Sequence, residues 1–185
     1  MSITAYLAGP DVFLPEAAAH AARKVAICAR FGLAGRPPLG EEAGTPDGLP
    51  EDRLWRAIYD DCVAMMEACD IVIANLTPFR GPSADAGTLV ELGWFLGRGK
   101  PVFAYSNTAT PFAERSRRQQ AAVPDPMPGL MVEGFGLADN LMIPGAVLQG
   151  GGHPVLLPAD GVDRPFDSLE VFTECARLAA GALRR

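Results

Sequence analysis

The sequence lacks several features that mark large classes of protein. It has no cluster of lysine or arginine long enough to neutralise a run of phosphates, and its formal net charge is −6. A nucleic acid polymer is therefore not an expected partner. The four cysteines have no paired short spacing, and the only two histidines, His20 and His153, are expected at the surface or in loops. This argues against zinc and against a disulfide framework, so we expect reduced thiols, no metal and no cofactor.

Long apolar runs are also missing. No stretch approaches the roughly 20 apolar residues of a membrane span, and residues 1–9 have neither the basic start nor the long apolar run of a secretory leader. We therefore expect a cytoplasmic protein that does not bind membranes. With 185 residues and 49% hydrophobic content, residues 1–185 have the size of a single domain with one substantial core.

What is present is an alternation of strand and helix patterns. Short apolar runs predict strands at residues 3–8, 33–36, 71–74, 101–105 and 155–157. Helical spacing predicts helices at residues 15–31, 51–68, 87–97 and 168–183, and one helical turn at 139–142. Residues 37–50 and 108–128 are expected to be long loops. The alternation predicts an α/β fold with a mostly parallel five-stranded sheet covered by helices on both faces.

Ligands of an open parallel sheet collect at the carboxyl ends of the strands, so the loops at these ends hold the candidate site. The first loop contributes Tyr6, Asp11 and Phe13, which are a phenol, a carboxylate and an aromatic face suited to stack on a planar base. The Gly9-Pro10 pair in this loop is a weak signal on its own. Phe13 is equally compatible with packing against the helix that follows.

The most informative stretch is residues 83–97, where the only charged residues are Asp85 and Glu91. Asp85, Thr88 and Glu91 recur every three residues and form a polar stripe on a helix that is otherwise apolar and expected to be buried. A buried carboxylate is costly unless it is paired with an arginine, reaches solvent or is used chemically. Two neighbouring carboxylates are also the equipment for cleaving a glycosidic bond, one as nucleophile and one as proton carrier.

These residues resemble the successive motifs of the nucleoside 2-deoxyribosyltransferase family. The resemblance rests on residues 6–13, 69–76, 85–93 and 99–102, with a further similar segment at 132–143. It implies a flavodoxin-like three-layer domain and a role in nucleotide salvage. The substrates implied are a small-molecule 2′-deoxynucleoside and a free nucleobase.

The resemblance also implies roles for individual residues. Glu91 attacks the anomeric carbon and forms a covalent deoxyribosyl-enzyme, Asp85 protonates the departing base, and Tyr6 positions the nucleophile. Phe13 lies where the family lines its base pocket. Asn140 matches an asparagine that reaches a neighbouring subunit's site, so a homo-oligomer is implied.

Other positions of the matched motifs are expected to contact the substrate, namely Gly9, Asp11 and Gly87. One departure concerns the sugar. Where many members carry a sugar-binding aspartate, eight residues before Asp70, this chain has Cys62. The nearby Asp61 is a candidate replacement, and Cys62 itself is expected to pack within its helix.

Two other functions stay open at this stage. A 2′-deoxynucleoside 5′-monophosphate N-glycosidase would share the fold and the glutamate but hydrolyse the bond, and the presence of Asp85 counts against it. A nucleoside-binding module without catalysis would be supported by the change at Cys62. A Rossmann-type cofactor enzyme is disfavoured because no Gly-x-Gly-x-x-Gly turn follows the first strand.

Overall fold

The computed structural model describes residues 2–38, 50–124 and 128–183. Its elements are β1 (Ile3–Tyr6), the short 3-10 helix η1 (Pro10–Phe13), α1 (Ala17–Arg30), β2 (Leu33–Arg36), α2 (Glu51–Ala68), β3 (Ile71–Asn75), α3 (Ala86–Gly97), β4 (Val102–Tyr105), α4 (Phe112–Ala122), α5 (Met142–Gly151) and α6 (Glu170–Ala182). Most of the loop expected at 37–50 lies outside the described residues.

The described strands form a parallel sheet in the order β2-β1-β3-β4. β3 is buried along its whole length, as its continuous apolar sequence predicts for a central strand of a parallel sheet. The fifth strand expected at 155–157 is reduced to one parallel bridge between Leu156 and Tyr105. Two backbone hydrogen bonds hold this bridge at the edge of β4: Leu156 N to Ala104 O and Ser106 N to Leu156 O.

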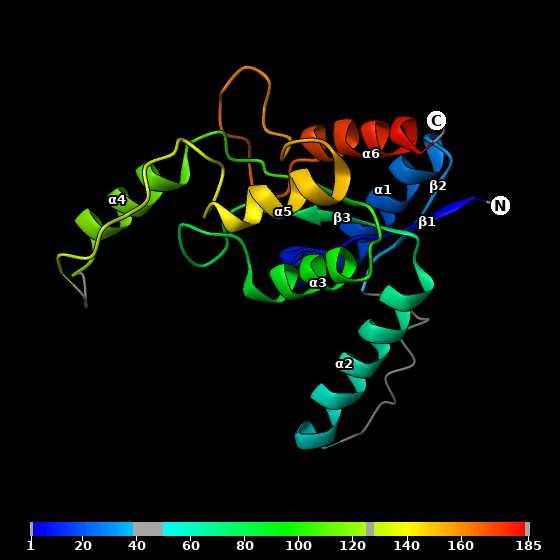
Figure 1. Ribbon diagram of the computed structural model, residues 1–185. Coiled ribbons are helices and arrows are strands. Elements are labelled where there is room, and N and C mark those ends of the chain that lie inside the picture. The colour runs from blue at the N-terminus through cyan, green and yellow to red at the C-terminus, as the bar shows by residue number, and fades with distance from the viewer. Residues whose placement is uncertain (1, 39–49, 125–127, 184–185) are drawn as a thin grey trace.

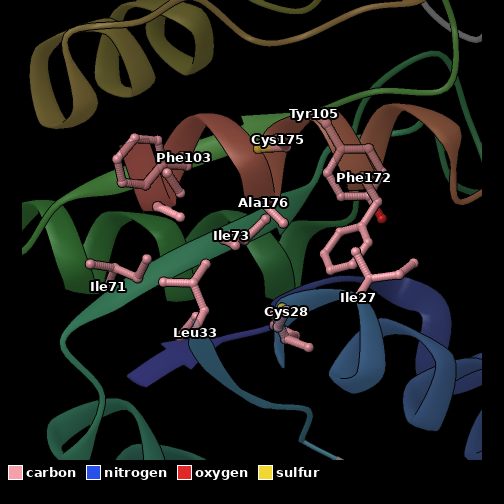
Figure 2. Close-up of a cluster of buried hydrophobic side chains, with 14 of the residues drawn as sticks. Ile27, Cys28, Leu33, Ile71, Ile73, Phe103, Tyr105, Phe172, Cys175 and Ala176 are labelled. Carbon is pink, nitrogen blue, oxygen red and sulfur yellow. The ribbon is translucent and has the colours of Figure 1, made fainter. Parts of the chain in front are cut away.

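Helices cover both faces of the sheet, which gives the expected three layers (Figure 1). One face packs against α1 and α6, where Ile71 and Ile73 of β3 meet Phe172 and Ala176 of α6 (Figure 2). The opposite face packs against α3 and α5 through Val72, Val102, Phe95 and Val147, among others. Because side chains alternate along a strand, β1, β3 and β4 each supply both cores.

Two helices extend away from this body, α2 at one end and α4 at another (Figure 1). The bounds of α2 agree with the sequence prediction, whereas α4 lies in the segment that was expected to be a loop. α5 begins where only a single helical turn was expected and runs for 10 residues.

Candidate functional site

The candidate site lies at the crevice between the carboxyl ends of β1 and β3. Here the strand order reverses, because the chain runs outward from β1 to β2 on one side and from β3 to β4 on the other, and such a switch point is where open α/β sheets bind ligands. Gly9 closes the end of β1 with φ of 155°, and a Cβ atom there would lie 2.7 Å from the Cβ of Asn75. Only glycine therefore allows the two loops to approach this closely.

Tyr6 and Glu91 form the centre of the site. Tyr6 is fully buried on β1, and the alternation of the strand directs it towards α3, on the face opposite to Leu7. Its hydroxyl donates a hydrogen bond of 2.6 Å to Oε1 of Glu91. Within the described residues no group donates to Oε2 of Glu91. One carboxylate oxygen is thus held in place and the other is available to attack.

The environment of Glu91 changes its titration. Burial raises the pKa of this carboxyl, the hydrogen bond from Tyr6 lowers it, and the charge of Asp85 raises it, with a result of about 7. Burial and the neighbouring Glu91 also raise the pKa of Tyr6, so its hydroxyl keeps its proton and acts as a donor. A carboxyl with a pKa near 7 that lies in a crevice is typical of a catalytic group.

Asp85 stands at the start of the same helix, as its N-cap. Its Oδ2 atom accepts hydrogen bonds from the backbone N–H of Thr88 at 2.9 Å and from the Thr88 hydroxyl at 3.1 Å. A Cβ atom on Gly87 would lie 3.1 Å from the same oxygen, so the absence of a side chain there leaves Asp85 accessible. Along the predicted polar stripe, Asp85 thus caps the helix and Glu91 accepts a hydrogen bond from Tyr6, while α3 exposes Val90 at 67% and is only partly buried as a whole.

A partly exposed aromatic cluster lies in the loops that follow β1 and β3, together with a residue before α6, and we call it the aromatic shelf: Phe13, Phe79, Arg80 and Phe166. The rings of Phe13 and Phe79 stack with centroids 5.4 Å apart and planes inclined by 12°, and Phe166 adjoins Phe79 at 6.2 Å. The guanidinium of Arg80 lies over both Phe13 and Phe79. Sequence reasoning identified only Phe13, although the loop at 75–85 that holds Phe79 was already a candidate.

Asp11 belongs to a buried network behind the crevice. Its carboxylate accepts hydrogen bonds from Lys24 Nζ at 2.7 Å and from Asn75 Nδ2 at 2.9 Å, and His20 Nε2 lies 3.5 Å away. Burial alone would raise the pKa of Asp11, but Lys24, His20 and Asn75 together lower it. Both oxygens are bound inside the protein. Asp11 was expected to contact the substrate, but in this structure its carboxylate contacts other protein side chains instead.

The same network corrects the expectation for His20. This residue is buried at 1% exposure and not at the surface, because α1 turns it towards Asp11. Lys24, on the same helix, is buried at 2% and also lies over the ring of Phe172. A sequence pattern alone gives no signal for this pairing, since α1 was recognised by its apolar residues.

Cys62 and Asp61 on α2 face different surroundings. The thiol of Cys62 is half-buried and lies near Tyr6 and Glu91, and burial raises its pKa while a hydrogen bond with Tyr6 lowers it. Asp61 lines a separate hollow of about 280 Å³ together with Thr4 and Arg36. Cys62 of α2 therefore lies near Tyr6 and Glu91, and its raised pKa keeps the thiol protonated.

Asn140 is exposed on the segment that leads into α5. Its side-chain oxygen accepts a hydrogen bond from Met142 N, the first residue of α5, at 3.1 Å. Its amide nitrogen donates to Oε2 of Glu133 at 3.1 Å, while Oε1 of Glu133 accepts from Leu141 N at 2.6 Å. The side chain is thus fixed in orientation at the molecular surface.

Residues 2–38, 50–124 and 128–183 contain no group of three or more His, Cys, Asp or Glu side chains arranged to hold a metal ion. None of the helices described in these ranges is both long and apolar enough to cross a membrane.

Comparison with known proteins gives consistent matches. Residues 5–142 match the nucleoside 2-deoxyribosyltransferase family. The chain is 30% identical over 164 residues to an uncharacterized protein of Schizosaccharomyces pombe, and the match covers 80% of this chain and 78% of that protein. Among solved structures, a 2-deoxyribosyltransferase from Leishmania mexicana matches with a TM-score of 0.63 and 28% identity, covering 94% of this chain and 97% of that chain.

A more distant solved structure shares the fold. A 2-deoxyribosyltransferase from Bacillus psychrosaccharolyticus matches with a TM-score of 0.51 and 19% identity, covering 78% of this chain and 82% of that chain. At this identity the likeness concerns the fold alone. The described sheet of four parallel strands between layers of helices is thus shared with proteins of very different sequence.

Proposed function

The chain belongs to the nucleoside 2-deoxyribosyltransferase family, and we propose that it transfers a 2-deoxyribosyl group from a 2′-deoxynucleoside to a free nucleobase. The observation that carries this proposal is the hydrogen bond of 2.6 Å from Tyr6 to Glu91, with Asp85 near enough to influence the same carboxyl. In Glu91 this bond fixes one carboxylate oxygen, and the other oxygen has no donor within the described residues.

In the first half-reaction, Oε2 of Glu91 attacks the anomeric carbon and forms a C–O bond. The bond from this carbon to the base breaks, its electron pair stays on the base nitrogen, and the base takes a proton from Asp85. Because the pKa of Glu91 is about 7, part of Glu91 is ionised at neutral pH and can attack. In this mechanism the two carboxyls have different roles, Glu91 as the attacking carboxylate and Asp85 as the acid.

In the second half-reaction, a different base binds and loses a proton to Asp85 as its nitrogen attacks the anomeric carbon. The C–O bond to Glu91 breaks and the carboxylate is restored. Two displacements at the same carbon return the original configuration. The absence of a 2′-hydroxyl from deoxyribose favours this chemistry, because that group withdraws electrons from the developing positive charge.

The aromatic shelf supports the choice of substrate. Phe13 is 59% exposed and its ring lies parallel to that of Phe79, so the shelf offers an apolar face to a planar base. Gly9 lets the loop after β1 approach Asn75, and Gly87 has no side chain to crowd the Asp85 carboxyl. We assign Asp11 an indirect part, since its carboxylate holds Lys24 and Asn75 inside the protein, and we leave Asp61 outside the reacting centre.

The test is to incubate the purified protein with deoxyinosine, with and without adenine, and to separate the products by chromatography. Glu91→Gln keeps the size of the side chain and removes the nucleophile, and Glu174→Gln, at an exposed position of α6, is the matched control. We expect deoxyadenosine only when adenine is present, in the wild type and in Glu174→Gln, and a loss of more than about 1000-fold in Glu91→Gln.

Other products would favour the other functions. Hypoxanthine and free deoxyribose formed at the same rate without adenine would support the hydrolase. If deoxyinosine bound without being consumed, the nucleoside-binding module would replace the enzyme. Turnover by the wild type that persists in Glu91→Gln would reject the assigned nucleophile.

A further inference from the structure

A buried carboxylate outside the reacting centre connects two of the segments that form the site. Asp139 is 2% exposed and precedes α5. Its Oδ1 accepts hydrogen bonds from the Ser83 hydroxyl at 2.5 Å and from Asn140 N at 2.8 Å, and its Oδ2 accepts from Ala84 N at 2.8 Å. A carboxylate this deeply buried is stable only with such partners.

A cation from a third segment completes this arrangement. Arg115 of α4 donates through Nε to Pro82 O at 2.8 Å, through Nη2 to Ala138 O at 2.7 Å, and through Nη1 to Thr110 O. Its Nη2 also lies 4.0 Å from Oδ2 of Asp139. The planar guanidinium can bind three carbonyls in fixed directions, which a lysine ammonium at the end of a flexible chain does not reproduce.

The residues that Arg115 and Asp139 hold are those directly before Asp85. Arg115 binds the carbonyl of Pro82, and Asp139 binds Ser83 and Ala84. The entry of the chain into α3, and with it the position of the Asp85 carboxyl, is therefore set by contacts with α4 and with the segment before α5. Among the described residues, neither Arg115 nor Asp139 forms a hydrogen bond or ion pair with Tyr6 or Glu91, so their direct contacts lie on the Asp85 side of the site.

We propose that Arg115 and Asp139 are positioning residues for proton transfer to the departing base, because they fix the loop that carries Asp85. This rests on the proposed function, in which Asp85 is the acid. The proposal makes the requirement for Arg115 depend on whether the departing base needs a proton. A base that leaves as an uncharged molecule without receiving a proton does not need a well-placed Asp85, whereas an ordinary base does.

The experiment compares two leaving bases in one half-reaction. Enzyme in excess over nucleoside is mixed with deoxyinosine or with 7-methyl-2′-deoxyguanosine, whose base already carries a positive charge and departs as neutral 7-methylguanine. The single-turnover rate of base release is measured by rapid quench, and spontaneous release is subtracted using Glu91→Gln. The variant is Arg115→Lys, and the matched control is Arg118→Lys, whose arginine is exposed on the same helix and pairs with Glu114.

We expect Arg115→Lys to release hypoxanthine about tenfold more slowly or worse, and 7-methylguanine within about twofold of the wild type. Arg118→Lys should match the wild type with both. Equal slowing with the two bases would overturn the proposal, because it would indicate a general structural defect, and so would unchanged rates with both.

A milder variant covers the case in which Arg115→Lys does not fold. Ser83→Ala removes one hydrogen bond to Asp139 and leaves the charges in place, so a smaller defect confined to hypoxanthine release is expected. The same rates in Ser83→Ala and wild type, together with an unfolded Arg115→Lys, would overturn the proposal. A wild type that releases neither base would instead reject the proposed function, which separates the two failures.

Discussion

At the scale of single residues, the bond between Tyr6 and Glu91 controls both the position and the ionisation of the nucleophile. The pKa of Glu91 is about 7 because burial raises it and Asp85 raises it further, while Tyr6 lowers it. The attacking species is the carboxylate, so activity rises as the pH rises through this pKa. For the wild type we expect kcat/KM to fall as the pH is lowered through a midpoint near pH 7.

Tyr6→Phe removes the hydrogen bond that lowers the pKa of Glu91. The pKa then rises, a smaller fraction of Glu91 is ionised at neutral pH, and the acidic limb of the profile moves to higher pH. The measurement is kcat/KM for deoxyinosine between pH 5 and 9, with Tyr59→Phe on the exposed part of α2 as control. A profile that is lower in height but has the same midpoint would show that Tyr6 does not tune Glu91.

Single carboxylates also mark the limit of sequence reasoning. Asp11 and Asp85 both follow strands that end at the crevice, and both belong to motifs of the family. What separates them is Lys24, which lies 13 residues beyond Asp11 and points inward from α1. Its direction depends on how α1 is rotated against the sheet, and the pattern of apolar residues does not fix that rotation closely enough.

At the scale of elements, the sequence predicts those helices and strands whose apolar residues recur with the period of a helix or a strand. β3, α2 and α3 agree with their predicted ranges within a residue or two, because their side chains follow the periods of strand and helix. α4 was missed because Phe112–Ala122 is mostly polar and exposed. It therefore lacks the apolar stripe by which the other helices were predicted.

α5 was missed for a different reason, since it contains Pro144 and three glycines that usually end a helix. Pro144 lies in the first turn, where its missing N–H costs nothing. Gly150 and Gly151 lie against β4, and a Cβ atom on Gly151 would be 2.0 Å from the carbonyl oxygen of Val102. These glycines therefore let the helix pack directly on the strand backbone.

This close approach gives a prediction for stability. Gly151→Ala places a methyl group against the backbone of β4, which has no flexible end to move, so we expect a loss of about 3 kcal/mol in the free energy of unfolding. Gly145→Ala, in the same helix with no atom within 4 Å of its added Cβ, should instead gain about 0.5–1 kcal/mol. Urea denaturation followed by circular dichroism measures both, and equal effects would contradict the packing argument.

At the scale of the whole molecule, the chain exposes large apolar side chains on several elements. Trp55, Ile58 and Tyr59 lie exposed on α2, and Val90 and Met142 on α3 and α5. Scattered apolar residues are normal on a surface, but Trp55, Ile58 and Tyr59 recur on neighbouring turns of a helix that extends away from the body (Figure 1). Such a surface favours assembly with a second copy of the chain.

Assembly would give the exposed Asn140 a partner site, and a mixed oligomer tests this. If Asn140 contributes to a neighbour's site, two inactive subunits can form one complete site. The Asn140→Ala subunit supplies Glu91 to this site, and the Glu91→Ala subunit supplies Asn140. The two variants, each expected to lose at least about tenfold alone, are co-expressed with different tags, and the mixed oligomer is isolated. One site of each such pair is complete, so it should recover about half of the wild-type activity per subunit.

The matched control pairs Glu91→Ala with Asp85→Ala. Asp85 is the N-cap of α3 and Glu91 lies within α3, so the same chain supplies both residues to a site. Each site of that mixed oligomer therefore lacks one of them, and no activity should return. Recovery in the control would mean that the subunits exchange more than Asn140. No recovery in either mixture, or a wild type that light scattering finds to be monomeric, would assign Asn140 to its own chain, where Glu133 and Asp139 already hold it beside the loop that enters α3.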